Sequence, residues 1–230
     1  MEKHLTYPAD GTLERIRADL KAQPPTSIVL AYGTPAFSVT YLALYMTFAG
    51  VAREKPVVYL DGANSFNPFI ITRIARKMGL SSEDLLKRIH ISRAFTCHQM
   101  QALVTDRLED AFRRFNTNVA VVSGLLDTFY DEDVPFGEAY DLLKAATTEF
   151  TRLAGKGARI LIACPDSRLP LEARRRRFMD HLIQTASTVL RSEGNDGKAR
   201  FVLEKPGRKL YERLRLPEPP RHYQHQWNWR

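Results

Sequence analysis

The sequence predicts an α/β fold: a mostly parallel sheet, flanked by helices on both faces, that ends in an antiparallel hairpin. Three observations predict it. Short apolar segments alternate with longer segments whose apolar residues recur every three or four positions. The short segments are apolar almost throughout, as is typical of parallel strands that are buried on both faces. Near the carboxyl end, two extended segments flank the turn-forming residues 194–197.

The elements follow a regular order along the chain. Residues 1–26 carry Leu13, Ile16 and Leu20 at helical spacing and stop at two prolines, so a short helix is expected. Strands are expected at residues 28–32, 57–61, 89–93, 119–122 and 160–163. Helices are expected at residues 38–51, after Pro68, from Ser82, at 98–115 and at 137–155. Residues 181–191 and 199–204 are then expected to be extended and to form the hairpin.

One domain with two short extensions is expected. The composition, 44% hydrophobic and 26% charged, is globular, and 230 residues can bury a core without disulfides or metal. We divide the chain into a helical arm at 1–26, a core domain at 27–205 and a basic, aromatic tail at 206–230. No apolar run reaches the ~20 residues that span a bilayer. Two cysteines, Cys97 and Cys164, are too few for a disulfide framework or a zinc site. We therefore expect a cytoplasmic protein with neither a metal nor a membrane partner.

The positive charge is concentrated near the carboxyl end. The chain has a net charge of +8, and residues 166–230 hold 15 Lys and Arg against 8 Asp and Glu. An anionic partner that binds the carboxyl-terminal third is therefore favoured, with nucleic acid as the first candidate. The alternative is a basic surface that only aids solubility.

The most specific features are five segments in a fixed order. They are Tyr59 to Pro68, Arg93 to Gln99, Val121 to Ser123, Leu161 to Cys164 and His181 to Thr188. In this order they resemble the motifs of the RecA/RadA recombinase superfamily, in the branch of archaeal and eukaryotic recombinases and their paralogues. The resemblance covers roughly residues 27–205 and implies a RecA-like core, which in this family binds ATP and DNA.

The phosphate-binding loop of that family is degenerate here. The family motif is Gly-x-x-x-x-Gly-Lys-Thr, in which backbone N–H groups cradle phosphates and the Lys neutralises them. The aligned stretch keeps its first and last members, Gly33 and Thr40, but has Ser38 for the second Gly and Val39 for the Lys. Pro35 also removes one backbone N–H. This Walker A motif therefore lacks its positive charge.

Two further catalytic positions of the family are also changed. The glutamate that activates the attacking water aligns with Ala63, and the aspartate that supports the metal aligns with Ser123. Phosphoryl transfer depends on positioning and charge neutralisation, so losing these groups and the Lys together removes most of the means of catalysis. We expect a pseudo-ATPase with no catalytic residue. Nucleotide binding without hydrolysis stays open.

The family binds DNA through loops after its fourth and fifth strands, and these two loops differ here. The loop after the fourth strand, residues 127–136, is acidic, which disfavours the usual two-loop mode. The loop after the fifth strand contains Arg168 and four consecutive arginines, Arg174, Arg175, Arg176 and Arg177. Guanidinium groups match phosphate geometry, so we expect these five residues to contact DNA. The alternative is a solvated helix start paired with Glu172 and Asp180.

The tail is the second candidate for DNA binding. Basic residues here, including Lys205, Arg208 and Lys209, lead into an aromatic end that carries Trp227 and Trp229. Such an arrangement suits single strands, because bases stack on rings while cations hold the backbone. Docking of Trp227 and Trp229 on the protein's own core, or on a second subunit, is the equal alternative.

The functional hypothesis is a DNA-binding accessory protein of recombination or repair, which holds single-stranded or branched DNA without hydrolysing ATP. Residues 1–26 contain no clear Phe-x-x-Ala polymerisation motif, so a homodimer or small oligomer is expected rather than a long filament. Two alternatives stay open. One is a scaffold that binds an active recombinase or another ATPase, and the other is an ATPase with an unorthodox nucleotide site.

Overall fold

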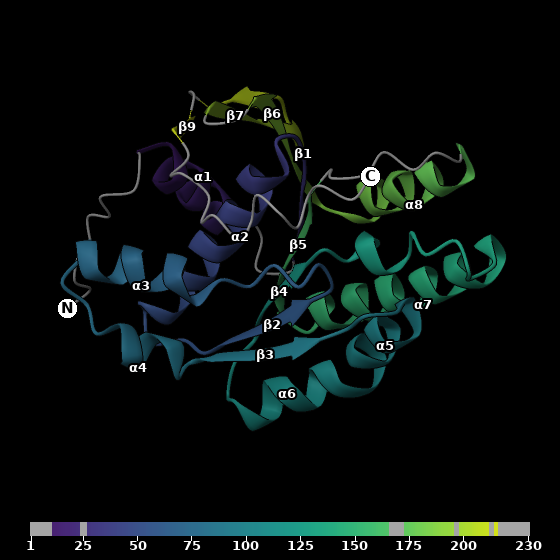
Figure 1. Cartoon of the computed structure of the whole chain (residues 1–230), viewed down its shortest axis with the longest axis horizontal. Helices are drawn as coiled ribbons and strands as arrows, with labels where there is room; N and C mark the ends of the chain where they lie inside the picture. Colours follow the sequence, from purple (N-terminus) through teal and green to yellow (C-terminus); the bar gives the residue numbers. More distant parts are fainter. Residues whose placement is uncertain (1–10, 24–26, 166–172, 196–197, 212–213, 216–230) are drawn as a thin grey trace.

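A computed structural model describes residues 11–23, 27–165, 173–195, 198–211 and 214–215. Within these residues the chain forms a mixed nine-stranded sheet with helices on both faces (Figure 1). The strand order is β3-β2-β4-β5-β1-β6-β7-β8, and β9 pairs with β7. The predicted fold class is confirmed.

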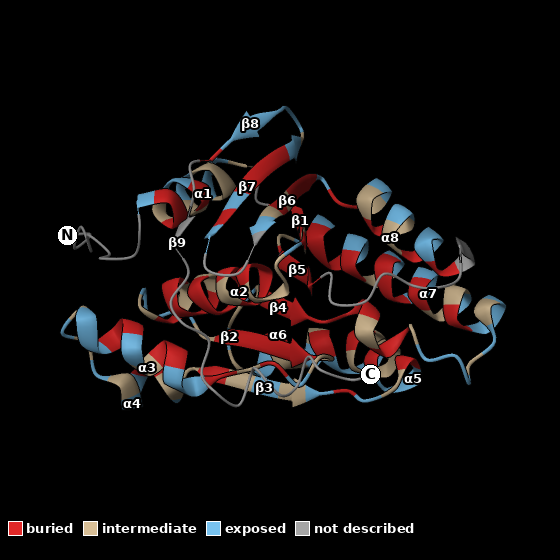
Figure 2. Cartoon of the chain, turned by 45° about the horizontal axis from the view of Figure 1, so that its top comes forward, coloured by how far each residue is buried: buried red, intermediate tan, exposed pale blue. Residues whose placement is uncertain are grey.

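The strands begin and end close to the predicted residues. They are β1 Ile28–Gly33, β2 Val57–Asp61, β3 Ile89–Arg93, β4 Val119–Ser123, β5 Arg159–Pro165, β6 Thr188–Asn195, β7 Lys198–Lys205, β8 Lys209–Leu210 and β9 Leu214–Arg215. The first six run parallel, and β7 returns antiparallel to β6 with Asn195 opposite Lys198. The apolar strands β2 and β4 lie between β3 and β5 and are buried, except for the half-buried Val119 at the start of β4 (Figure 2).

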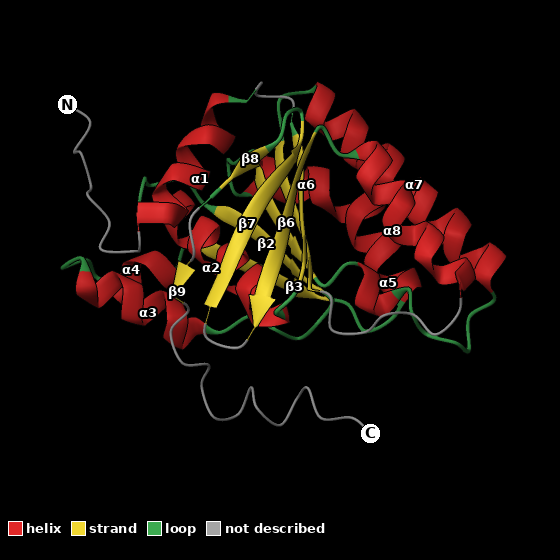
Figure 3. Cartoon of the chain, turned by 90° about the horizontal axis from the view of Figure 1, so that it is seen from above, coloured by secondary structure: helices red, strands yellow, loops and turns green. Residues whose placement is uncertain are grey.

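The helices divide between the two faces of the sheet (Figure 3). One face carries α1 Gly11–Ala22, α2 Ala36–Val51, α3 Pro68–Lys77 and α4 Ser82–Leu86. The other carries α5 Cys97–Ala102, α6 Leu108–Arg114, α7 Phe136–Gly155 and α8 Ala173–Thr185. A π-helical turn at Leu103–Arg107 joins α5 to α6, so the single helix expected at 98–115 is interrupted, and a short 3-10 helix spans Leu126–Thr128.

Local sequence explains where several helices begin. Asn67 accepts a hydrogen bond from the N–H of Phe69 at 2.9 Å, and Pro68 occupies the first turn of α3. Ser81 caps α4 and Thr96 caps α5 in the same way, through their hydroxyl oxygens. These caps satisfy N–H groups that have no partner inside the helix.

Two hydrophobic cores lie on opposite faces of the sheet. Leu30 and Val122 face α5 to α8, whereas Val29 faces α1 to α4, as the alternation of side chains along a strand requires. The helix expected in the amino-terminal arm is α1, and its Leu13 and Ile16 are buried in the second core. Helix α1 is therefore packed onto the domain.

The extended segment expected at 181–191 is partly wrong. Residues 181–185 belong to α8, and the strand begins only at Thr188. The reason is the spacing of apolar residues, because Phe178, Leu182 and Ala186 recur every four positions and are all buried in one core. The apolar residues of this segment follow the helical period up to Ala186, and the extended segment starts after it.

Candidate nucleotide and nucleic-acid sites

The positions expected to form the nucleotide site lie at the carboxyl ends of β1, β2 and β4. The helices that follow β1 and β2 lie on one face of the sheet, and those that follow β4 and β5 lie on the other. Open α/β sheets form ligand crevices where the connections after two neighbouring strands lead to opposite faces of the sheet. Two such points concern the nucleotide positions, one between β1 and β5 and one between β2 and β4.

At the first point, the end of β1 pairs with strand β6 on the side away from β5. Gly33 has a φ of 111°, and a Cβ atom there would lie 2.3 Å from the carbonyl oxygen of Ser192. The N–H of Thr34 donates to that same carbonyl at 3.1 Å. The hydroxyl of Ser192 donates in turn to the carbonyl of Thr34 at 3.1 Å. The backbone that follows β1 is therefore held by β6.

The aligned phosphate-loop residues lie inside α2. Only Thr34 and Pro35 separate β1 from this helix, so Ser38, Val39 and Thr40 are helical, and all three are buried. The hydroxyl of Ser38 contacts the hydroxyl of Ser192 and donates to the carbonyl of Pro35 at 2.7 Å. The hydroxyl of Thr40 donates to the carbonyl of Ala36 at 3.3 Å. Polar groups that would face a nucleotide are thus bonded within the protein.

Val39 contributes to the hydrophobic core next to α2 and is fully buried. The side chain of a lysine at this position would leave the backbone inside an apolar core. A magnesium–ATP complex therefore does not fit the residues between Gly33 and Thr40, and we derive no step of catalysis through it.

At the second point, the loops after β2 and β4 touch each other. The N–H of Gly62 donates to the carbonyl of Ser123 at 2.8 Å. A Cβ atom on Gly124, whose φ is 66°, would lie 2.3 Å from the Cβ of Ala63. The two positions aligned with catalytic carboxylates, Ala63 and Ser123, therefore lie at a packed contact between loops.

The buried carboxylate at this edge, Asp61, is used to hold its own loop. It accepts hydrogen bonds from the N–H groups of Ser65 at 2.9 Å and Phe66 at 3.0 Å. The hydroxyls of Ser65 and Ser123 lie 3.0 Å apart, and Arg93 lies 3.8 Å from the carboxylate. The described residues contain no cluster of three or more His, Cys, Asp or Glu that could hold a metal.

The arginine segment is divided between the interior and the surface. The Arg175 side chain is buried, and its guanidinium donates to the carbonyls of Phe129 at 2.7 Å and Val134 at 3.0 Å. Both terminal nitrogens are thus bonded to the loop after β4, and a contact of Arg175 with DNA stays a prediction. Arg175 fixes that acidic loop to α8.

Arg176 and Arg177 are exposed on α8. The guanidinium of Arg177 lies 5.8 Å from the ring centroid of Phe136 and 5.6 Å from that of Tyr140. These rings stack with each other and with Phe178. Arg177 thus rests on an aromatic surface with its charge still accessible. Arg168 lies outside the described residues, and the Arg174 side chain is not among those described.

Of the basic residues predicted to bind DNA in the carboxyl-terminal region, two are bonded within the protein and one is exposed. Lys205 donates to the carbonyls of Gln184 and Ala186, where α8 ends, and so satisfies acceptors that a helix terminus leaves free. Lys209 pairs with Asp19 of α1. Arg208 is exposed. Trp227 and Trp229 lie outside the described residues, so their stacking on DNA stays a prediction.

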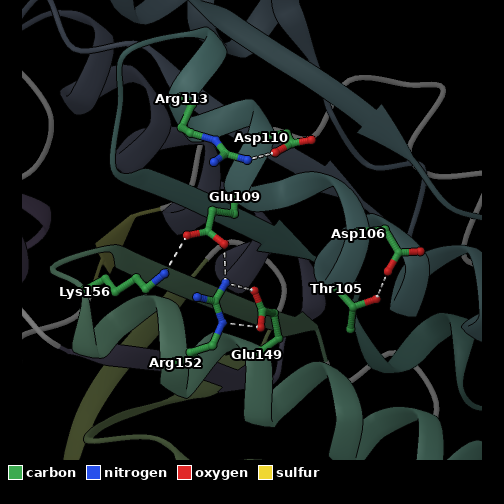
Figure 4. A network of polar contacts seen from close by, with 8 residues as sticks. All are labelled: Thr105, Asp106, Glu109, Asp110, Arg113, Glu149, Arg152 and Lys156. Atoms are coloured by element: carbon green, nitrogen blue, oxygen red, sulfur yellow. Dashed lines mark hydrogen bonds and ion pairs between the residues drawn. The ribbon is translucent and has the colours of Figure 1, made fainter.

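An exposed ion-pair network joins α6 to α7 (Figure 4). Glu109 of α6 pairs with Arg152 and, at 2.8 Å, with Lys156, while Arg152 also pairs with Glu149 at 2.6 Å. The hydrogen bonds from Arg152 and then Lys156 lower the pKa of Glu109 to about 2. This network has a structural role, because its ion pairs link α6 to α7.

Sequence reasoning missed two residues of these sites. Ser192 was not singled out because it lies in β6, far along the chain from Gly33, and only the parallel pairing of β1 with β6 brings them together. The buried role of Arg175 carried no signal beyond its place one turn before Phe178. Asp61 was visible as a carboxylate at the end of an apolar strand, with Ser65 four residues later.

The Rad51 family model matches residues 42–139. The match begins inside α2 and runs through β2, β3 and β4 into α7, so it includes Ala63 and Ser123 and begins after Thr40. The sheet around it is of the RecA type, mostly parallel with antiparallel strands at the carboxyl-terminal edge. No helix in the described part of the chain is long and apolar enough to cross a membrane. Over residues 42–139 the chain is thus similar to the Rad51 family, which supports the expected membership of the RecA/RadA recombinase superfamily.

Proposed function

We propose that this protein is a RecA-like, DNA-binding accessory protein of recombination or repair that binds single-stranded or branched DNA without hydrolysing ATP. The observation that carries the proposal is the packing at the nucleotide end of the sheet. Ala63 lies against Gly124 at the point between β2 and β4, and Gly33 lies against Ser192 of β6, beside the point between β1 and β5. The superfamily match supports the link to recombination and DNA.

The absence of hydrolysis rests on chemistry as well as on space. Val39 brings no charge to a phosphate, and Ala63 and Ser123 bring no carboxylate to a water or a metal. Since phosphoryl transfer needs all three functions together, restoring any one of them leaves the others missing. The protein is therefore proposed to act by binding.

The DNA contact is proposed at α8 and the segments around it. Arg176 and Arg177 are exposed, and Arg168 and Arg174 flank them in the sequence. Arg208, Trp227 and Trp229 would add a second contact from the tail. The protein is proposed to act as a homodimer or small oligomer, in contact with an active recombinase.

A scaffold that binds a recombinase or another ATPase and contacts DNA little is the second candidate. It is favoured by apolar side chains exposed near the end of β3 and the start of α3. Phe69 and Phe95 are each 70% exposed, and Ile91 is 41% exposed. Large apolar side chains that are exposed to solvent favour a contact with another protein.

The experiment is a titration of labelled single-stranded, duplex and four-way-junction DNA at about 50 mM and about 200 mM salt. The test variant is Arg174→Gln, Arg176→Gln and Arg177→Gln, which leaves the buried Arg175 in place. If each arginine meets one phosphate, the slope of log affinity against log salt becomes shallower by about 2.1 on single strands.

The matched control replaces three exposed cations of other elements, Lys21, Arg73 and Lys198, with Gln. An equal effect of the test and control variants would contradict the α8 assignment. A wild-type protein that binds none of the three DNAs would favour the scaffold. Magnesium-dependent turnover of ATP would favour the unorthodox ATPase.

A further inference from the structure

A row of cations lies along the amino edge of the sheet, opposite the edge that carries the degenerate nucleotide site. Arg53 and Lys55 precede β2, Arg114 ends α6 before β4, and Arg159 opens β5. All four side chains belong to exposed residues. We name them the amino-edge cations.

Hydrogen bonds make this edge continuous from β3 to β5. The N–H of Val57 donates to the carbonyl of Arg88 at 2.9 Å, which joins the starts of β2 and β3. The hydroxyl of Thr117 donates to the carbonyl of Pro56, which joins β4 to β2. The N–H of Arg159 donates to the carbonyl of Asn118 at 2.7 Å, which joins β5 to β4. Neighbouring strands lie ~4.8 Å apart, so the edge from β3 to β5 spans about 14 Å.

The amino-edge cations differ from neighbouring cations, which are paired with carboxylates. Lys87 pairs with Glu83 at 2.7 Å, and Lys156 pairs with Glu109 at 2.8 Å. Arg113 pairs with Asp110, as Figure 4 shows. Within the part of the chain that the structure describes, none of the four amino-edge cations has an ion pair, although Arg114 lies 5.3 Å from the ring of Phe115. Glu54 is the acidic residue that stands between the first two.

Helix dipoles do not explain this row. Cations in the last turn of a helix are stabilised by the carbonyls there, and every helix before a parallel strand ends at this edge. Arg114 occupies such a position. Lys55, however, lies three residues beyond the C-cap residue Ala52, and Arg159 is already part of a strand. At the opposite edge, the loop after β4 is acidic and carries Asp127, Asp131, Glu132 and Asp133.

We propose that the amino-edge cations bind the phosphate backbone of nucleic acid, as a contact separate from α8 and the tail. The proposal rests on the proposed function in assuming that the chain binds DNA. A row of unpaired cations spread along one edge suits a linear polyanion, whose charges repeat every few ångströms. Among the described residues, the exposed large apolar side chains are Phe69, Ile91, Phe95 and Leu210, and none of them lies in the connections that carry the row, so this part of the edge has no large apolar side chain to insert into a bilayer.

The test compares two variants of equal charge in the full chain. The amino-edge variant carries Arg53→Gln, Lys55→Gln, Arg114→Gln and Arg159→Gln. The control carries Arg15→Gln, Arg73→Gln, Arg107→Gln and Lys198→Gln, which are exposed cations away from this edge. Four phosphate contacts should make the salt slope on single strands shallower by about 2.8 in the amino-edge variant, and the control should keep most of the wild-type slope. A thermal melt of each variant confirms that it is folded.

The outcomes separate this proposal from the function on which it rests. If the wild-type protein binds DNA and the amino-edge variant keeps its slope, the amino edge is not a contact, while DNA binding stands. If the wild-type protein binds no DNA, both fail. If the amino-edge variant loses binding to phosphatidylserine vesicles while its DNA binding is unchanged, the row faces a membrane, and the nucleic-acid proposal is overturned.

Discussion

Arg175 of α8 donates a hydrogen bond of 2.7 Å to the backbone carbonyl of Phe129, in the loop that follows β4. A second bond, of 3.0 Å, reaches the carbonyl of Val134. One buried guanidinium therefore fixes the loop after β4 to α8. It also places the acidic residues 131–133 near the exposed arginines of α8.

Arg175→Ala should lower the free energy of unfolding by about 3 kcal/mol, because two buried carbonyls lose a charged donor. Arg176→Ala is the control and should change it little, since Arg176 is exposed. Urea denaturation at neutral pH measures both. Equal stabilities for the two variants would mean that the Arg175 guanidinium does not hold the loop.

Val39→Lys should not restore nucleotide binding, although it supplies the residue that the phosphate-loop motif lacks. Val39 is fully buried in an apolar core, so an ammonium group there should destabilise the fold by roughly 4 kcal/mol or more. Thr34→Lys, at an exposed position of the same segment, should be tolerated. Binding of a fluorescent ATP analogue and urea denaturation give the two readouts. A stable Val39→Lys variant that binds the analogue would show that the site is open.

Acidification should weaken the contact between α7 and α8 through His181. Burial, and then the nearby Lys144, lower the pKa of His181 from its ordinary 6.5, and its Nε2 lies 2.8 Å from the hydroxyl of Thr147. The unfolded chain therefore takes up this proton at a higher pH than the folded chain. The stability is complete above pH 6.5 and falls as the pH drops below that value, until the folded pKa is reached.

His181→Gln keeps a polar group near Thr147 and removes the proton uptake, so its stability should depend less on pH in this window. Urea denaturation between about pH 7 and pH 5 makes the comparison. Burial also lowers the pKa of His90, so His90→Gln is the matched variant, and it separates the contribution of His90 to the pH dependence from that of His181. A His181→Gln protein with the wild-type dependence on pH would contradict the assignment.

The network around Glu109 should stabilise the protein only above acidic pH. The folded pKa of Glu109 is about 2 against an ordinary 4.5, so its contribution is present above pH 4.5 and is lost as the pH falls toward 2. Glu109→Gln should therefore differ from wild type at neutral pH, and the two should converge in acid and in high salt. Thermal melts across this range test it, with Glu54→Gln as the exposed control. If Glu109→Gln and wild type melt at the same temperature at neutral pH and low salt, the network does not stabilise the protein.

The fold could be predicted because its signals are local. The apolar composition of residues 57–61 and 119–122 predicts strands there. Asn67 and Pro68 mark the start of α3. The segment at 181–185 was assigned wrongly because a short apolar run fits either a strand or a helix. In the structure this segment is helical, and its Leu182 is buried in the same core as Phe178.

The candidate site could be predicted only in part. The losses at Val39, Ala63 and Ser123 are visible in the sequence, since they are changes of residue type against a family motif. The packing of Gly33 against Ser192 depends on the pairing of β1 with β6, which the sequence does not show. The exposure of each arginine from 174 to 177 likewise depends on how α8 sits against α7.

The most direct measurement is the affinity for labelled single-stranded DNA with and without magnesium–ATP, together with phosphate release under the same conditions. A closed nucleotide end predicts the same DNA affinity in both cases and no magnesium-dependent release of phosphate above the buffer. An affinity that changes with ATP, or turnover that DNA stimulates, would contradict it.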